Sequence, residues 1–308
     1  MIFGFFWFFS CYSQNPTVDS LKLVLQNPKL HDTTRLGIVD QIMANASKRS
    51  PEAIQYNALM GEIASRNLKN KKLSKQLRDT YYHYLAYYYC DKAVNMLSVK
   101  ESREALGYID KAIAIFSYLK DEESLWATIT NKGSFLRKIG AHKEAIDCYY
   151  KALKHQEAAG NILGAGSTTA CIAQVYDDQG NLPMTILYYL KAKEAFDKTK
   201  NLNADTLYEK AVLLHNLGFA YYKSGNYEAA EKYLLQAREL DLENEFYAQL
   251  GFTYDKLGNI YMKQKKYNAA LKMFNLGIGY AEKERAKANL LESIGELYFI
   301  QKQYGKAA

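Results

Sequence analysis

The segment LGFAYYKSGNYEAA, from Leu217 to Ala230, decides the fold because its pattern recurs along the chain. Aligned on the glycine of this segment, the pattern reappears as LGNIYMKQKKYNAA at 257–270, IGELYFIQKQYGKA at 294–307 and KGSFLRKIGAHKEA at 132–145. A fifth copy, IAQVYDDQGNLPMT at 172–185, has Ala173 in the glycine position. Self-similarity at spacings of about 40 residues indicates a repeat protein, in which each unit buries its apolar face against its neighbours.

Each copy describes two paired helices. The small residue at the aligned position and the aromatic or leucine three residues later lie on one face of a first helix. Seven residues after the aligned position, Gly140, Gly180 and Gly225 end that helix, because glycine adopts the left-handed conformation without strain. An alanine at +12 and a large side chain at +16 form the inner face of a second helix. Ser50-Pro51 is typical of such a helix start, with an N-cap followed by proline.

These residues resemble the tetratricopeptide repeat family over roughly residues 32 to 308. Two degenerate copies precede the clear ones, with Ala93 and Gln41 in the glycine position. The resemblance implies an all-α, right-handed superhelical solenoid of about seven helical hairpins, the last of them incomplete at Ala308. The small residues expected to anchor the second helices are Ala53, Ala105, Ala145, Thr185, Ala230, Ala270 and Ala307.

The chain's ends add expectations about processing. Ile2 to Phe9 carry no polar side chain, and small residues at Cys11 and Ser13 follow, which is typical of a signal peptide. We therefore expect a signal peptide at 1–13, a linker at 14–31, a degenerate hairpin and connection at 32–85, and a repeat array at 86–308 that is truncated in its last repeat. We therefore expect the protein to be exported to the periplasm or cell envelope, and the alternative is that it stays in the cytoplasm. Acylation of Cys11, as in a lipoprotein, also stays open.

Composition excludes several classes of function. The net charge is +7, and the window from Arg66 to Arg78 alone holds six basic residues and no acidic one, which favours a solvated turn between helices over a nucleic-acid site. The four cysteines include no C-x-x-C pair, and the five histidines show no metal-binding spacing. Neither the polar stretch 177–181 nor the glycines at 160–166 match a calcium loop or a P-loop. The sequence predicts no catalytic residue, no cofactor and no metal.

The family resemblance places a partner-binding groove along the first helices. Its side chains would lie three and six residues before the glycine position, and one and four residues after it. Asn131 and Asn216, two residues before that position, match asparagines that bond a bound peptide's backbone in the family. The remaining groove residues are Thr130, Ser134, Arg137, Gln174, Asp177, His215, Phe219, Tyr222, Asp255, Asn259 and Met262. This mixture suits an extended peptide, whereas the basic pair with which chaperone-binding members clamp a carboxylate is missing.

The layout also resembles the N-terminal sensory half of signalling proteins from the Bacteroidetes group of bacteria. In those proteins the repeats lead to a histidine kinase, an adenylate cyclase or a DNA-binding output domain. That resemblance implies a peptide- or protein-binding input module whose output domain is not in this chain. A free-standing scaffold for protein complexes is the alternative. Either way we expect a protein or peptide partner, no nucleic acid, and membrane attachment only through a signal, an anchor or a missing C-terminal segment.

Overall fold

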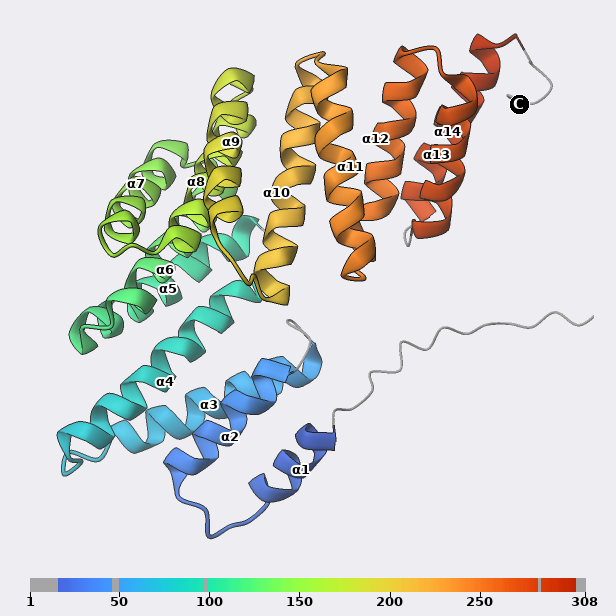
Figure 1. The fold of residues 1–308 in the computed structure, drawn as a ribbon. Coiled ribbons are helices and arrows are strands. Elements are labelled where there is room, and N and C mark those ends of the chain that lie inside the picture. The colour runs from blue at the N-terminus through green and yellow to red at the C-terminus, as the bar shows by residue number, and fades with distance from the viewer. Residues whose placement is uncertain (1–15, 46–49, 97–98, 282–283, 303–308) are drawn as a thin grey trace, which may run out of the picture. The chain divides into compact units, whose positions relative to one another are not determined.

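A computed structural model describes residues 16–45, 50–96, 99–281 and 284–302, and these residues are helical, with no β-strand among them (Figure 1). Two compact units divide at Cys148 and Tyr149, inside one helix. The first unit contains α1 (Pro16–Leu25), α2 (Asp32–Asn45), α3 (Pro51–Leu68), α4 (Lys75–Val94), α5 (Val99–Leu119) and α6 (Glu122–Lys138), and the boundary lies in α7 (His142–Ala158). The second contains α8 (Ile162–Asp178), α9 (Leu182–Lys198), α10 (Ala204–Lys223), α11 (Tyr227–Glu243), a 3₁₀ turn (Tyr247–Gln249), α12 (Leu250–Lys263), α13 (Tyr267–Tyr280) and α14 (Glu284–Ile300).

Consecutive helices pair as hairpins, as the repeats predict. In the second unit α8 packs against α9, α10 against α11 and α12 against α13 (Figure 1). In the first unit α2 packs against α3, and α4 against α5. The predicted all-α class and helical hairpins are therefore confirmed.

The turns inside the hairpins have the conformation that the sequence predicts. Gly140, Gly180 and Gly225 have φ values of +82°, +72° and +81°. In the α8–α9 turn the next residue, Asn181, donates its backbone N–H to the carbonyl of Tyr176 (2.9 Å), and its side chain caps α9 by accepting from the backbone N–H of Met184 (3.3 Å). Lys265 occupies the same place between α12 and α13 with φ +61°, so the turn persists where glycine is absent. The residue seven places after the aligned position therefore adopts positive φ and reverses the chain whether or not it is a glycine.

The helices of a hairpin meet at the small residues. Ala230 and Ala270, twelve residues after Gly218 and Gly258, are completely buried. A Cβ placed on Gly218 would lie 2.7 Å from Cγ of Leu234, and one on Gly258 would lie 2.6 Å from Cδ1 of Phe274. The side chain sixteen residues later therefore fills the space that glycine leaves, and any larger residue in the glycine position would collide with it.

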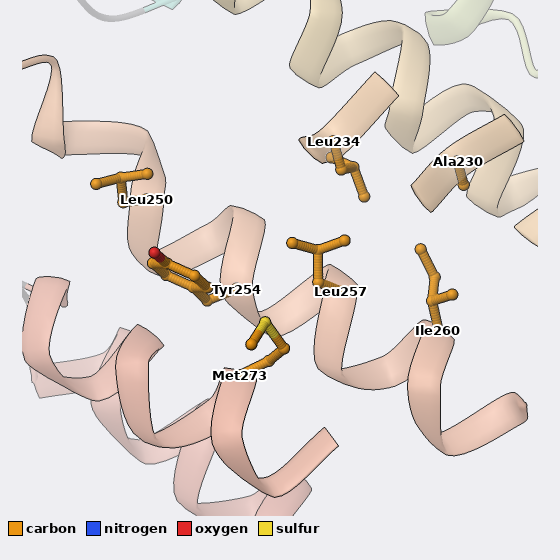
Figure 2. Close-up of a cluster of buried hydrophobic side chains, with 7 residues drawn as sticks. All are labelled: Ala230, Leu234, Leu250, Tyr254, Leu257, Ile260 and Met273. Carbon is orange, nitrogen blue, oxygen red and sulfur yellow. The ribbon is translucent and has the colours of Figure 1, made fainter. Parts of the chain in front are cut away.

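The cores between hairpins consist of larger apolar side chains. Figure 2 shows Leu257 and Ile260 of α12 directed at Leu234 and Ala230 of α11, with Met273 of α13 beside α12. Burying a leucine or isoleucine of this kind contributes about 2 kcal/mol. The stability of each hairpin therefore includes a contribution from the hairpins beside it, as in other repeat proteins.

The N-terminal region departs from two expectations. Pro16–Leu25, inside the stretch expected to be a linker, forms helix α1, whose Val18 is buried with Ile38 and Ile42 of α2. Gln41, aligned with the glycine position, is exposed, so that alignment is wrong. The close approach in this region is made instead by Gly61 of α3, where a Cβ would lie 2.6 Å from the ring of Tyr88 on α4. The signal peptide expected at 1–13 lies outside the described residues.

Replacing Gly258 by alanine should destabilise the protein by about 1–3 kcal/mol, because the new Cβ collides with the Phe274 ring in a filled core. Gly279 on α13 is the matched control, since no heavy atom lies within 4 Å of its Cβ position. Gly279→Ala should leave stability unchanged or raise it by about 0.5–1 kcal/mol. Urea unfolding followed by circular dichroism compares the two. Equal midpoints for both variants would contradict the packing described here.

Candidate functional site

The first helices of the second unit carry a continuous set of polar and aromatic side chains. Asp177 of α8 accepts two hydrogen bonds from Nζ of Lys223 on α10, at 2.8 and 3.0 Å. Asp255 of α12 accepts from Ser293 of α14 at 3.4 Å. Neighbouring first helices are thus tied by polar contacts in addition to their apolar cores.

Three aromatic rings lie between those contacts. Phe219 and Tyr222 of α10 are stacked with their centroids 6.4 Å apart, and Phe252 of α12 meets Phe219 edge to face at 5.4 Å. Phe252 is 42% exposed, which is high for phenylalanine, while the other two rings are partly buried. We call Phe219, Tyr222 and Phe252, with Lys223 and Lys256, the aromatic face.

Two ammonium groups cover the rings of the aromatic face. Nζ of Lys256 lies 5.0 Å from the ring centroid of Phe252, 5.7 Å from that of Phe219 and 5.9 Å from that of Tyr222. Nζ of Lys223 lies 4.6 Å from the Phe219 centroid. Each lysine also has a carboxylate partner, since Lys256 donates to Asp255 at 2.9 Å and Lys223 binds Asp177. Both lysine charges on this face are therefore paired, and the ring that is most exposed to solvent is that of Phe252.

Burial affects the hydroxyl of the aromatic face. Burial, followed by the neighbouring Tyr227, raises the pKa of Tyr222 above its ordinary value. The phenol therefore stays protonated at neutral pH and keeps its hydrogen-bond donor. A face of two phenylalanines, one neutral tyrosine and compensated charges can bind apolar side chains and peptide groups.

The structure distributes the predicted groove residues unevenly. Thr130, Asn131, Ser134 and Arg137 all lie on α6, in the first unit. The other predicted groove residues lie in the second unit, on α8 (Gln174, Asp177), α10 (His215, Asn216, Phe219, Tyr222) and α12 (Asp255, Asn259, Met262). Within that unit, direct contacts connect Phe219 to Tyr222, and Asn259 to Asp255, whose Oδ1 accepts from Nδ2 of Asn259 at 3.0 Å.

His215 is a correction. It is only 3% exposed and does not line a surface. Its Nε2 lies 2.7 Å from Oδ2 of the buried Asp241 on α11, and its Nδ1 lies 2.8 Å from Oγ1 of the buried Thr253 on α12. The imidazole therefore joins three helices of two hairpins. His215 and Asp255 both lie three residues before the aligned glycine of their repeats. Asp255 is partly exposed, whereas His215 is buried, because Asp241 on α11 supplies a buried hydrogen-bond partner for it.

Hydrogen-bond accounting fixes the charge of this buried pair. The Thr253 hydroxyl donates to the carbonyl of Gln249 at 3.1 Å, so Nδ1–H of His215 donates to Thr253. The 2.7 Å contact between Nε2 and Asp241 needs one more proton, held by either partner. In both cases the pair is neutral overall, which a fully buried site requires, since a lone buried charge is strongly unfavourable.

Three residues of the aromatic face were missed by the sequence prediction. Phe252 lies six residues before Gly258 and Lys256 two before it, so the offsets already stated would have found both. Lys223 lies five residues after Gly218 and matches none of them. Its role depends on Asp177 of the preceding hairpin, which only the folded arrangement brings near.

Other candidate chemistry has structural explanations. Burial raises the pKa of the Cys90 thiol to about 11, so this cysteine stays protonated at neutral pH. A cavity of about 600 Å³ lies between α7, α8 and α9, but no predicted groove residue lines it. Across the residues that the structure describes, no group of three or more histidine, cysteine or acidic side chains is placed to hold a metal. None of the described helices is long and apolar enough to cross a bilayer.

Two tetratricopeptide repeat family models match the chain, at residues 128–157 and 209–283. These ranges cover α6–α7 and α10–α13, the hairpins with the clearest sequence pattern. The chain carries tetratricopeptide repeats. Both models describe repeats typical of protein-interaction modules, and neither describes a catalytic family.

Relatives and solved structures agree on the repeats. A TPR repeat-containing protein of Methanocaldococcus jannaschii is 28% identical over 194 residues, which cover 61% of this chain and 30% of the relative's own length. The structure of BtubC from P. vanneervenii matches with a TM-score of 0.61 at 18% identity, over 77% of this chain and 91% of that one. A signal-transduction ATPase with a tetratricopeptide repeat sensor from Pyrococcus horikoshii matches with a TM-score of 0.62 at 17% identity, over 94% of this chain and 46% of that one. At these identities the structural matches show the fold.

Replacing Asp241 by alanine should lower the free energy of unfolding by about 3–5 kcal/mol, because it leaves the His215 imidazole buried without its partner. Asp241→Asn keeps a hydrogen-bonding group of the same shape, whose amide N–H can donate to Nε2, and should cost less. Glu239→Ala, at an exposed position of the same helix, is the control and should change stability by less than about 0.5 kcal/mol. Urea midpoints measure all three. A loss for Asp241→Ala no larger than that for Glu239→Ala would show that the buried pair does not hold the hairpins together.

Proposed function

We propose that this chain is a protein-binding module that holds an extended peptide segment of its partner along the first helices of its repeats. The aromatic face carries this proposal. It combines a 42% exposed phenylalanine with two further rings, and polar contacts to α8 and α14 extend the same set of side chains over four first helices. Exposed aromatic side chains at the centre of a polar surface are typical of binding hot spots.

The binding mode follows from the chemistry of this face. An apolar side chain of the peptide would pack on Phe219 and Phe252, and the amide side chain of Asn216 would bond its backbone. The lysines are already paired with Asp177 and Asp255, so they position the rings and do not supply a free charge. The partner segment is therefore expected to depend on an apolar anchor rather than on a terminal carboxylate.

A peptide library displayed on phage and selected on the full chain tests this function. We expect selected peptides to share an apolar residue, and Phe219→Ala with Phe252→Ala to weaken their Kd at least about tenfold, since hot-spot truncation costs more than about 1.4 kcal/mol. Replacing Asn216 of α10 by alanine should also weaken binding while helicity stays unchanged. Tyr247→Ala removes a similarly exposed ring (45%) outside the first helices and should have no effect. Peptides that bind the double phenylalanine variant as tightly as the original chain would overturn the proposal.

We further propose that the module is the sensory input of a bacterial signalling protein and that it is exported. The apolar N-terminal segment, and the repeats that follow it, support this placement by their resemblance to such proteins. A free-standing scaffold would use the same aromatic face, and the span of that face over several first helices suits a scaffold equally. The two functions differ in what the module is attached to, and not in how it binds.

Export and attachment have direct tests. Protein isolated from its native host should begin near Cys11 or Gln14 if the signal is removed, and mass spectrometry of the N-terminal peptide measures this. Intact Met1 would contradict export. The reading frame beyond the codon for Ala308 should encode a membrane span and a kinase, cyclase or DNA-binding domain if the module is an input. A frame that encodes only further repeats would favour the scaffold.

A further inference from the structure

The basic run in the first unit forms a small, well-defined loop. Lys69–Ser74 connects α3 to α4, and Lys75 opens α4. Lys69, Lys71, Lys72 and Lys75 are all exposed, and in the part of the chain that the structure describes none of them has a carboxylate partner. We call these four residues the lysine loop. The sequence predicted a solvated turn here, and the structure adds what holds it in shape.

Internal hydrogen bonds hold the backbone of this loop. The guanidinium of Arg78 donates to the carbonyls of Lys71 (3.5 Å) and Leu73 (3.4 Å). The side chain of Asn70 accepts from the backbone N–H of Lys72 at 2.9 Å, and Ser74 caps α4 by accepting from Leu77. Side chains of the loop and of the start of α4 thus bond the loop backbone, while the four lysine side chains stay exposed.

The two arginines of the run are already used inside the protein. Arg78 serves the loop's own carbonyls, and Arg66 donates to Asp32 of α2 at 3.1 Å. The apolar side chains Leu68, Leu73 and Leu77 pack against the core formed by α2, α3 and α4. Between residues 69 and 76 the exposed side chains are the four lysines, Asn70, Ser74 and Gln76. Arg66, just before them, is also exposed, but its guanidinium is paired with Asp32.

The side chains of the lysine loop favour one kind of partner over a protein or a single-stranded nucleic acid. Protein interfaces are depleted in lysine and depend on aromatic, apolar or arginine anchors, and the lysine loop offers none to a partner. Single-stranded nucleic acid is bound through stacked aromatic rings, and no large apolar side chain between residues 55 and 86 is exposed. Four strongly hydrated point charges on an exposed turn, without carboxylate partners among the described residues, fit instead a diffuse layer of negative charge. Clusters of four to eight basic residues beside a membrane span or on an amphipathic helix bind such layers on anionic membranes, and the four lysines of this turn reach the lower end of that number.

We propose that the lysine loop is an electrostatic contact for an anionic lipid surface. This goes beyond the proposed peptide binding and uses different residues in the other unit. It also goes beyond the expectation from the sequence, which is membrane attachment only through a signal, an anchor or a missing C-terminal segment. The attraction involves no inserted side chain, so binding should require anionic lipid and weaken as salt screens the charges.

Co-sedimentation with vesicles tests the proposal. The full chain should bind phosphatidylcholine vesicles that contain about 30% phosphatidylserine, because each lysine near such a surface strengthens partitioning by about fivefold. Replacing all four loop lysines by glutamine should lower the partition coefficient at least about a hundredfold. The matched control replaces Lys143, Lys151, Lys154 and Lys272, which are exposed on α7 and α13, and removes the same total charge. Circular dichroism confirms that both variants keep their helices.

The outcomes separate the possibilities. Loss of binding in the loop variant alone, with release at about 0.5 M salt, supports the proposal. Equal loss in both variants would assign binding to net charge, and equal binding to vesicles of phosphatidylcholine alone would assign it to apolar contact. Either result overturns the proposal. Loop-dependent binding that is tighter to duplex DNA or to polyglutamate than to the anionic vesicles would also overturn it, and would identify the loop as a nucleic-acid or acidic-protein site.

Discussion

The rest of this structure depends on one steric constraint, the close approach of two helices at a residue without a bulky side chain. At Gly218 and Gly258 the space that a Cβ would occupy is taken by Leu234 and Phe274, sixteen residues further on. The alanine at the twelfth position, Ala230 or Ala270, completes the crossing from the second helix. Because both helices of a hairpin are fixed at this crossing, the other faces of the first helix point in defined directions. One of them packs on the next hairpin, and another carries the side chains available to a partner.

That division explains how function arises from a repeated structure. Leu257 and Ile260 face the preceding hairpin and stabilise the stack, whereas Phe252 and Asp255 on the same helix face outward. These outward side chains lie outside the buried apolar cluster, so they can differ between repeats. In the second unit they form the aromatic face, with its balanced charges. In the first unit the α3–α4 connection carries the lysine loop, so the exposed side chains of the two units differ in chemistry.

Much of this could be predicted from sequence because the determinants are local. The spacing from Gly218 to Tyr221, Gly225 and Ala230 defines a helix, its end and its partner without reference to the rest of the chain. What could not be predicted depends on contacts between distant residues. His215 follows the same spacing as Asp255, yet it is buried because Asp241 and Thr253, on two other helices, satisfy its imidazole.

The repeat alignment of the N-terminal region was wrong for a related reason. There the close contact is made between Gly61 on α3 and Tyr88 on α4, so an alignment that looks for a small residue on α2 selects the exposed Gln41. Helix α1 carries no repeat pattern at all, and its position follows only from the burial of Val18 against α2.

Hydrogen–deuterium exchange of the full chain, with and without a peptide selected for binding, tests the central claim most directly. Amides of first helices α10 and α12, which carry the aromatic face, should exchange more slowly in the complex, because a bound peptide suppresses local opening of the helices that it contacts. Exchange in second helices α11 and α13 should change much less. Protection confined to the second helices, or to helices of the first unit, would contradict the assignment of partner binding to the aromatic face.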